Sequence, residues 1–313
     1  MAPINPFKSM PQRPSFRELL ASGSPLVMPC AHDALSARLI QKAGFPAMAI
    51  SGSGALAARY GLPDLGIAGL ADMLAVTRDI LDATSMACMG DGDDGYGDLK
   101  SVARTVRANE SLGVGALVLE DQTRIAKRPG QSAAVGVVSD EEIAAKLRTA
   151  IDARSSEDFW IIGRTDAYGA QGIDAALRRA ELYLRCGVDG LFVAGVRKAE
   201  ELERIGRTFR GTPLSVVVYG GEGWPSLSIA ELHAMGYTQI MYPLALLLPM
   251  CTLFADTLNA LKHAAATGEQ PPAGWDEKRG RTIFADAVEL DRWLSLETAT
   301  SHLPSADQEG TGQ

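Results

Sequence analysis

The sequence predicts an α/β protein, a (β/α)8 TIM barrel with a C-terminal helical extension, and three observations lead to that prediction. Eight short apolar runs alternate with amphipathic helical stretches, and eight such units within about 250 residues match this barrel. The chain has 313 residues, a length that suits either two ordinary domains or one large barrel. Clusters of polar residues follow the apolar runs, where the strand ends of a barrel form its active face.

Each predicted strand is an unbroken apolar run, which is typical of parallel strands covered on both faces. The first run, Leu26–Cys30, precedes Asp33, a good helix cap, and a helix at Ala34–Ile40 that Gly44 ends. The other strands are predicted at Ala47–Ile50, Met86–Met89, Ala116–Leu119, Phe159–Ile162, Gly190–Val193, Pro213–Val218 and Gln239–Tyr242. The other helices are predicted at Gly69–Asp82, Leu99–Leu112, Asp140–Ala153, Asp174–Cys186, Ala199–Phe209, Ser228–Met235 and Leu244–Ala266.

The alternative architecture is a doubly wound open sheet. It would need a glycine-rich phosphate turn after the first strand, and Pro29–Asp33 is not one. We assign residues 1–268 to a catalytic barrel, 269–303 to a C-terminal helical arm and 304–313 to a disordered tail. The arm contains one predicted helix near Ile283–Leu296, which is apolar on more than one face and is expected to pack on a neighbouring subunit.

Composition excludes several classes of function. Lys and Arg total 30 against 38 Asp and Glu, a net charge of -8, whereas nucleic-acid binding needs a basic surface. The longest apolar stretch, Ile240–Ala255, is broken by two prolines and predicts a buried core helix rather than a membrane span. The four cysteines are far apart, so neither a zinc site nor a disulfide framework is indicated. The first residues contain no apolar core of a signal peptide, and we expect a soluble, cytoplasmic protein with no nucleic-acid or membrane partner.

The segment Gly90–Gly97 carries three carboxylates in eight residues, at Asp91, Asp93 and Asp94. Hard oxygen ligands on a glycine-rich loop suit Mg²⁺ or Mn²⁺. The alternative is a solvated acidic turn, since Asp-Gly is ordinary turn chemistry. Glu120 and Asp121 end the next predicted strand. They favour the metal, because neighbouring barrel strands lie about 5 Å apart and these carboxylates can converge on one ion.

Three further positions are candidates for binding an acid. Arg164 follows the fifth strand and can hold a carboxylate through two N–H groups, or form an internal salt bridge with one of the acids. The turn Ser51–Gly54 offers hydroxyls and backbone N–H groups as an anion site, or is a plain glycine-rich turn. Of the four histidines, His32 alone is at a predicted strand end.

Seven motifs together resemble the isocitrate lyase / phosphoenolpyruvate mutase superfamily, in particular its 2-methylisocitrate lyase branch. They occur in order through the predicted barrel, at Asp33–Arg38, Ser51–Ser53, Gly61–Gly66, Asp91–Gly97, Leu119–Gln122, Lys127–Arg128 and Arg164–Ala167. The resemblance implies a barrel whose last helices are exchanged between subunits, usually in a homotetramer, and Mg²⁺ as the cofactor.

The resemblance also implies roles for individual residues. Asp91, Asp93 and Glu120 would hold the metal directly or through water. Ser51, Gly52 and Ser53 would bind the carboxylate of a pyruvate-like unit, with Arg164 on the oxyanion side. Asp64 matches an acid near the metal, His32 matches a position that touches substrate, and residues 123–138, including Lys127, match a mobile gating loop.

Three departures distinguish this chain from the lyases. They carry Lys-Arg-Cys-Gly-His on the gating loop, with the cysteine as acid/base, whereas here Pro129 occupies that position. Val193–Val196 and Val217–Tyr219 replace polar groups that would bind further carboxylates. The latter change resembles the oxaloacetate decarboxylase branch, although Pro243 resembles the lyases.

These features predict a Mg²⁺-dependent lyase that cleaves a C–C bond of a small α-oxo diacid, such as oxaloacetate, through a pyruvate enolate. The catalytic set would be Arg164, Asp64, Lys127, His32 and Tyr219. One alternative is retro-aldol cleavage of a hydroxy acid of the 2-methylisocitrate or 2,3-dimethylmalate type. P–C bond chemistry and a barrel that binds a metabolite without turnover are the others.

Overall fold

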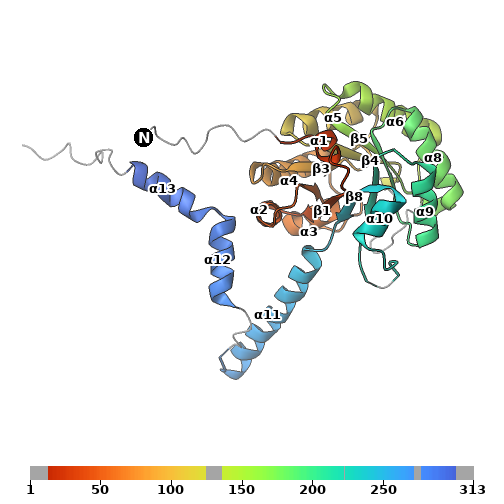
Figure 1. Cartoon of the computed structure of the whole chain (residues 1–313). Coiled ribbons are helices and arrows are strands. Elements are labelled where there is room, and N and C mark those ends of the chain that lie inside the picture. Colours follow the sequence, from red (N-terminus) through yellow and green to blue (C-terminus); the bar gives the residue numbers. More distant parts are fainter. Residues whose placement is uncertain (1–12, 125–135, 222, 271–275, 301–313) are drawn as a thin grey trace, which may run out of the picture. The chain divides into compact units, whose positions relative to one another are not determined.

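The computed structural model describes residues 13–124, 136–221, 223–270 and 276–300. Within them, eight parallel strands pair in chain order and β8 pairs with β1, so the predicted (β/α)8 barrel is confirmed as a closed structure (Figure 1). The strands are β1 Leu26–Ala31, β2 Ala47–Ile50, β3 Ala87–Asp91, β4 Ala116–Glu120, β5 Trp160–Thr165, β6 Gly190–Val193, β7 Leu214–Val217 and β8 Tyr237–Tyr242.

Helices follow the strands and surround the barrel (Figure 1). Those of the barrel are α1 Phe16–Leu20, α2 Ala34–Lys42, α3 Gly52–Tyr60, α4 Leu70–Asp82, α5 Leu99–Leu112, α6 Asp140–Ala153, α7 Ala167–Gln171, α8 Ile173–Arg185, α9 Ala199–Thr208 and α10 Ile229–Met235. Asp33 caps α2 as predicted, because its carboxylate accepts the backbone N–H of Ser36 at 2.7 Å. The last helices are α11 Leu247–Thr267, α12 Glu277–Ala287 and α13 Leu290–Thr300.

The apolar core has two layers, because successive strand residues point to opposite faces. One layer fills the barrel and is built from alternate strand residues such as Met28 and Met89, with Phe16 of α1 packed against it. The other layer lies between strands and helices and includes Cys88, the residue next to Met89. The interior is therefore packed with side chains, and the strand ends are left to form a pocket.

Two helical regions differ from the prediction. A loop was predicted between Ile50 and Gly69, but α3 begins at Gly52, because the Ser51 hydroxyl accepts the N–H of Gly54 at 3.1 Å and caps the helix. Of the two alternatives for Ser51–Gly54, the plain turn is therefore excluded. The single helix predicted near Ile283–Leu296 is two helices, α12 and α13. The chain breaks between them where Glu289 adopts a left-handed backbone with φ of 54°.

The stretch Ile240–Ala255 is also not the buried core helix that its composition predicts. Strand β8 ends at Tyr242, and α11 begins five residues later. Leu253 and Phe254 are 60% and 57% exposed. None of the described helices combines the length and the apolar character that crossing a membrane requires.

The chain divides into two units. One is Pro11–Thr252, which holds the barrel, and the other contains Leu253 and the helices after it. The predicted boundary at residue 268 remains a prediction, as does the exchange of helices between subunits. The predicted tail at 304–313 lies outside the described residues.

Candidate active site

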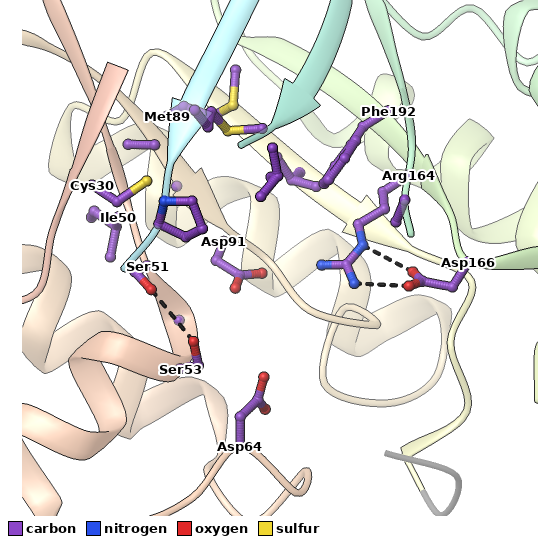
Figure 2. Close-up of a pocket in the computed structure, with 18 of the residues that line it drawn as sticks. Cys30, Ile50, Ser51, Ser53, Asp64, Met89, Asp91, Arg164, Asp166 and Phe192 are labelled. Atoms are coloured by element: carbon purple, nitrogen blue, oxygen red, sulfur yellow. Dashed lines mark hydrogen bonds and ion pairs between the residues drawn. The ribbon is translucent and has the colours of Figure 1, made fainter. Parts of the chain in front are cut away.

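A pocket of about 200 Å³ opens at the carboxyl ends of the barrel strands (Figure 2). Its polar lining comes from Ser51, Ser53, Asp64, Asp91, Gln122, Arg164, Asp166 and Tyr219. Its apolar lining includes Ile50, Met89, Val118, Phe192, Ala194, Val217, Met241 and Pro243. The pocket therefore gathers most of the residues that the sequence selects, from the ends of four strands and the connection between α3 and α4, into one cavity suited to a small polar ligand.

The serine side of the pocket is the start of helix α3. Ser51 is buried, and its hydroxyl lies 3.4 Å from that of Ser53. The N–H groups of the first helical turn lack partners within the helix, and the helix dipole is positive there. The segment predicted to bind an anion is thus a helix N-terminus, and the hydroxyls of Ser51 and Ser53 lie side by side there (Figure 2).

Arg164 lies on the opposite side and pairs with Asp166 there (Figure 2). A second buried carboxylate, that of Glu120, also holds it. Its Nε and Nη2 both donate to Asp166 at 2.9 Å, and Nη1 lies 2.8 Å from Glu120 Oε2. Glu120 and Arg164 are register partners on β4 and β5, which explains their approach. Burial acts against the charge, but Asp166 and Glu120 outweigh it and hold the pKa of Arg164 well above its ordinary value. The internal salt bridge, one of the two alternatives for this residue, is therefore present, with two of five N–H groups left for a ligand.

The acidic loop after β3 places its carboxylates in different surroundings. Asp91 lines the pocket, together with Asp64 from the α3–α4 connection. Asp93 lies beside them in a small adjoining pocket and contacts Arg124 at 3.3 Å. Among the described residues, no three His, Cys, Asp or Glu side chains are close enough to hold a metal by themselves.

Of the remaining residues that the sequence selects, some line the pocket and others do not. Tyr219 lines the pocket and is 52% exposed, while the desolvation of its hydroxyl raises its pKa and Arg164 acts in the opposite direction. His32 is 4% exposed and is absent from the pocket lining; its Cβ lies close to Gly54 in the first turn of α3. Lys127 and Pro129 lie outside the described residues.

Sequence reasoning assigned no role to Asp166 and placed Asp121 with the possible metal ligands. Asp121 is fully buried and accepts hydrogen bonds from Thr165, Tyr183, Arg179 and the backbone of Asp166 at 2.6–3.0 Å. It therefore braces the strand that carries Arg164. The signal for Asp166 was its spacing, because an acid two residues from a strand-end arginine can fold back on it.

A closed barrel with such a pocket at its strand ends is the arrangement of a barrel enzyme. The chain belongs to the phosphoenolpyruvate phosphomutase family, which it matches over residues 16–262, and so to the superfamily that its motifs predict.

Three comparisons illustrate the relationship. The chain is 38% identical to 2,3-dimethylmalate lyase of Eubacterium barkeri, over 80% of this chain and 86% of the relative. It is 37% identical to 2-methylisocitrate lyase of Salmonella typhimurium, over 74% of this chain and 78% of the relative. It resembles the structure of oxaloacetate acetylhydrolase with 3,3-difluorooxalacetate at a TM-score of 0.79 and 29% identity, covering 90% of this chain and 96% of that one. The predicted enzyme class, a carbon–carbon lyase, is confirmed by these relatives.

Proposed function

We propose that this enzyme cleaves a C–C bond of a small α-oxo diacid such as oxaloacetate and leaves a pyruvate enolate. One observation carries the proposal: the polar groups of the pocket lie at the start of α3 and around Arg164, and the rest of its lining is largely apolar. Arg164 is the one cationic residue among the described lining residues. The start of α3 and Arg164 suit one carboxylate and one oxyanion, and the second carboxylate of oxaloacetate loses its charge when it leaves as carbon dioxide. A further carboxylate buried without a partner would cost several kcal/mol.

The pyruvate unit of the substrate would bind between the two polar sides. Its carboxylate would accept hydrogen bonds from the first turn of α3 and from the hydroxyls of Ser51 and Ser53. The two remaining N–H groups of Arg164 would face the oxygen on which negative charge develops. Because Asp166 and Glu120 fix the guanidinium, it needs little reorganisation during the reaction.

The residues present fit a divalent metal, Mg²⁺ or Mn²⁺. Asp91 and Asp64 supply hard oxygen ligands, and Mg²⁺ in proteins commonly takes one or two carboxylates and several waters. A side chain at Gly52 would collide with the Asp91 carboxylate, so glycine lets that carboxylate lie against the start of α3 at the edge of the pocket. Asp91 would hold the metal directly, with Asp93 and Glu120 holding it through water. When bound, the metal supplies Lewis-acid polarisation of the substrate oxygen.

Tyr219 distinguishes between the candidate reactions. Its hydroxyl is protonated at neutral pH and can donate a proton to a carbanion, and its raised pKa makes that hydroxyl harder to deprotonate. Decarboxylation needs such a donor and no base. Retro-aldol cleavage of a hydroxy acid also needs a base, and His32 is absent from the pocket lining.

A second candidate is retro-aldol cleavage of an alkyl-substituted malate. The apolar side formed by Phe192, Ala194, Val217 and Met241 favours it, because it can accept a methyl group. The identity to 2,3-dimethylmalate lyase also supports it.

The test is turnover on a panel of oxaloacetate, 2,3-dimethylmalate, 2-methylisocitrate and phosphonopyruvate, each with Mg²⁺. The proposal expects oxaloacetate to be cleaved fastest, with pyruvate as a product. Tyr219→Phe should slow that reaction by about 10²–10⁴-fold if the hydroxyl supplies the proton. Preference for 2,3-dimethylmalate would favour the second candidate, and cleavage of phosphonopyruvate alone would contradict both.

We further propose that the enzyme is a homo-oligomer, a tetramer by family resemblance, and that it works in the cytoplasm. The exposed apolar residues of α11 support the first statement.

A further inference from the structure

Arg124 is outside the pocket lining, yet its guanidinium binds two loops that border the pocket. Its Nε donates to Asp94 Oδ1 at 2.9 Å, and Nη2 contacts Asp93 Oδ2 at 3.3 Å. Its Nη1 donates to the carbonyl oxygens of Gly66 and Ala68 at 3.2 and 3.3 Å. One planar group thus joins the loop after β3 to the connection between α3 and α4.

The loop after β3 needs such support because its backbone is strained. Asp93 and Tyr96 have φ of 50° and 59°, a region that residues other than glycine seldom occupy. The Arg124 guanidinium lies 5.1 Å from the centroid of the Tyr96 ring, so it contacts both strained residues. A second cation, Lys146 of α6, donates to the backbone carbonyl of Asp94 at 3.0 Å.

The other loop is shaped to receive the same side chain. Gly66 has φ of 70°, and a Cβ there would lie 3.3 Å from the Arg124 Cβ. Glycine at this position therefore permits both the left-handed turn and the close approach. Two residues before it is Asp64, which lines the pocket.

We propose that Arg124 is a positioning residue that holds the Asp64 loop and the Asp91–Asp94 loop in one arrangement and thereby sets their carboxylates for a divalent cation. The statement about the cation rests on the proposed function, and the statement about the loops does not. Arginine suits this role because its rigid fork reaches four acceptors on two loops, whereas a lysine ammonium is a single point of charge.

The first measurement is amide hydrogen exchange without added metal, on the wild type, Arg124→Gln and Arg124→Lys. Arg154→Gln is the matched control. Arg154 is also partly buried and binds Asp189 and the Phe159 carbonyl, at the end of the strands away from the pocket. Arg124→Gln should exchange faster in residues 61–69 and 91–97 together, and Arg124→Lys should be intermediate. Arg154→Gln should exchange at the wild-type rate in both segments. Unchanged exchange in either segment of Arg124→Gln would overturn the inference, and Arg124→Lys allows the same comparison if the glutamine variant fails to fold.

The second measurement is calorimetric titration with Mg²⁺ alone. Loss of a group that orients metal ligands typically weakens metal binding by about 10–100-fold, which is the effect expected for Arg124→Gln and not for Arg154→Gln. Equal Mg²⁺ affinity in Arg124→Gln and wild type would refute the link to the cation. A wild type that binds no Mg²⁺ would refute the metal role in the proposed function, and the exchange data would still decide whether Arg124 holds the loops.

Discussion

Replacing Arg164 with glutamine removes the one cation among the described lining residues, and the structure sets the size of the effect. The guanidinium makes three charge-assisted contacts, two with Asp166 and one with Glu120, and both carboxylates are about 3% exposed or less. Removing one partner of a buried ion pair typically costs about 3–5 kcal/mol. At about 2–4 °C per kcal/mol for a chain of this size, Tm should fall by roughly 6–20 °C.

Activity should fall as well, by about 10²–10³-fold, because a fixed donor at the developing oxyanion is lost. The activity and the Tm of Arg164→Lys should lie between those of the wild type and of Arg164→Gln, because lysine keeps the charge but loses the two-point contact with Asp166. Thermal unfolding followed by circular dichroism and steady-state rates on oxaloacetate measure the two effects. A variant within about 2 °C of the wild type and with unchanged kcat would refute both the ion-pair account and the role of Arg164.

Four other predictions test separate parts of the account. Asp91→Ala should abolish turnover and weaken Mg²⁺ binding with the fold intact, and full activity in EDTA would show that no metal is needed. Burial lowers the pKa of His32 and Asp33 opposes this shift, so the stability from neutral His32 is present above pH 6.5 and lost as pH falls through the lowered pKa. His32→Asn should therefore flatten the acid limb of a stability–pH curve below pH 6.5, and an unchanged limb would contradict this role. Leu258, 64% exposed on α11, should lie in the proposed subunit contact, so Leu258→Asp should reduce the particle mass in light scattering, and a full-sized tetramer would exclude that contact. Because Pro129 replaces the acid/base cysteine of the lyases and Val193–Val196 replaces partners for further carboxylates, turnover of 2-methylisocitrate and isocitrate should be lower by about 10²–10⁴-fold than that of oxaloacetate, and an ordinary rate on either would show that another group, such as Tyr219, replaces that cysteine.

The barrel could be predicted from the sequence because its signals are local. An apolar run followed by a capping residue such as Asp33 specifies a strand and the start of a helix without reference to the rest of the chain. The helix α3 was missed because two glycines and two serines dominate its first turn, and glycine is unfavourable in helix interiors. The break at Glu289 was missed because no proline or glycine marks it.

The site was predicted less completely, since its contacts join distant residues. The motifs place Ser51, Asp91 and Arg164 at strand ends, and the structure brings all three into one pocket. The sequence left open whether Arg164 binds a ligand or an internal acid, because that choice depends on the register of β4 against β5. The contacts of Arg124 depend on the path of two loops, which no local pattern specifies.

The most direct test of the central claim is product analysis of oxaloacetate turnover by ¹³C NMR in D₂O, with Mg²⁺ and an enzyme-free Mg²⁺ blank. Cleavage through an enolate gives carbon dioxide and pyruvate that carries deuterium at its methyl carbon. The wild type should form them faster than the blank does, and Arg164→Gln should lose this excess rate. The account predicts this pattern. Formation of oxalate and acetate, the products of hydrolysis between C2 and C3, or pyruvate at no more than the blank rate would contradict it.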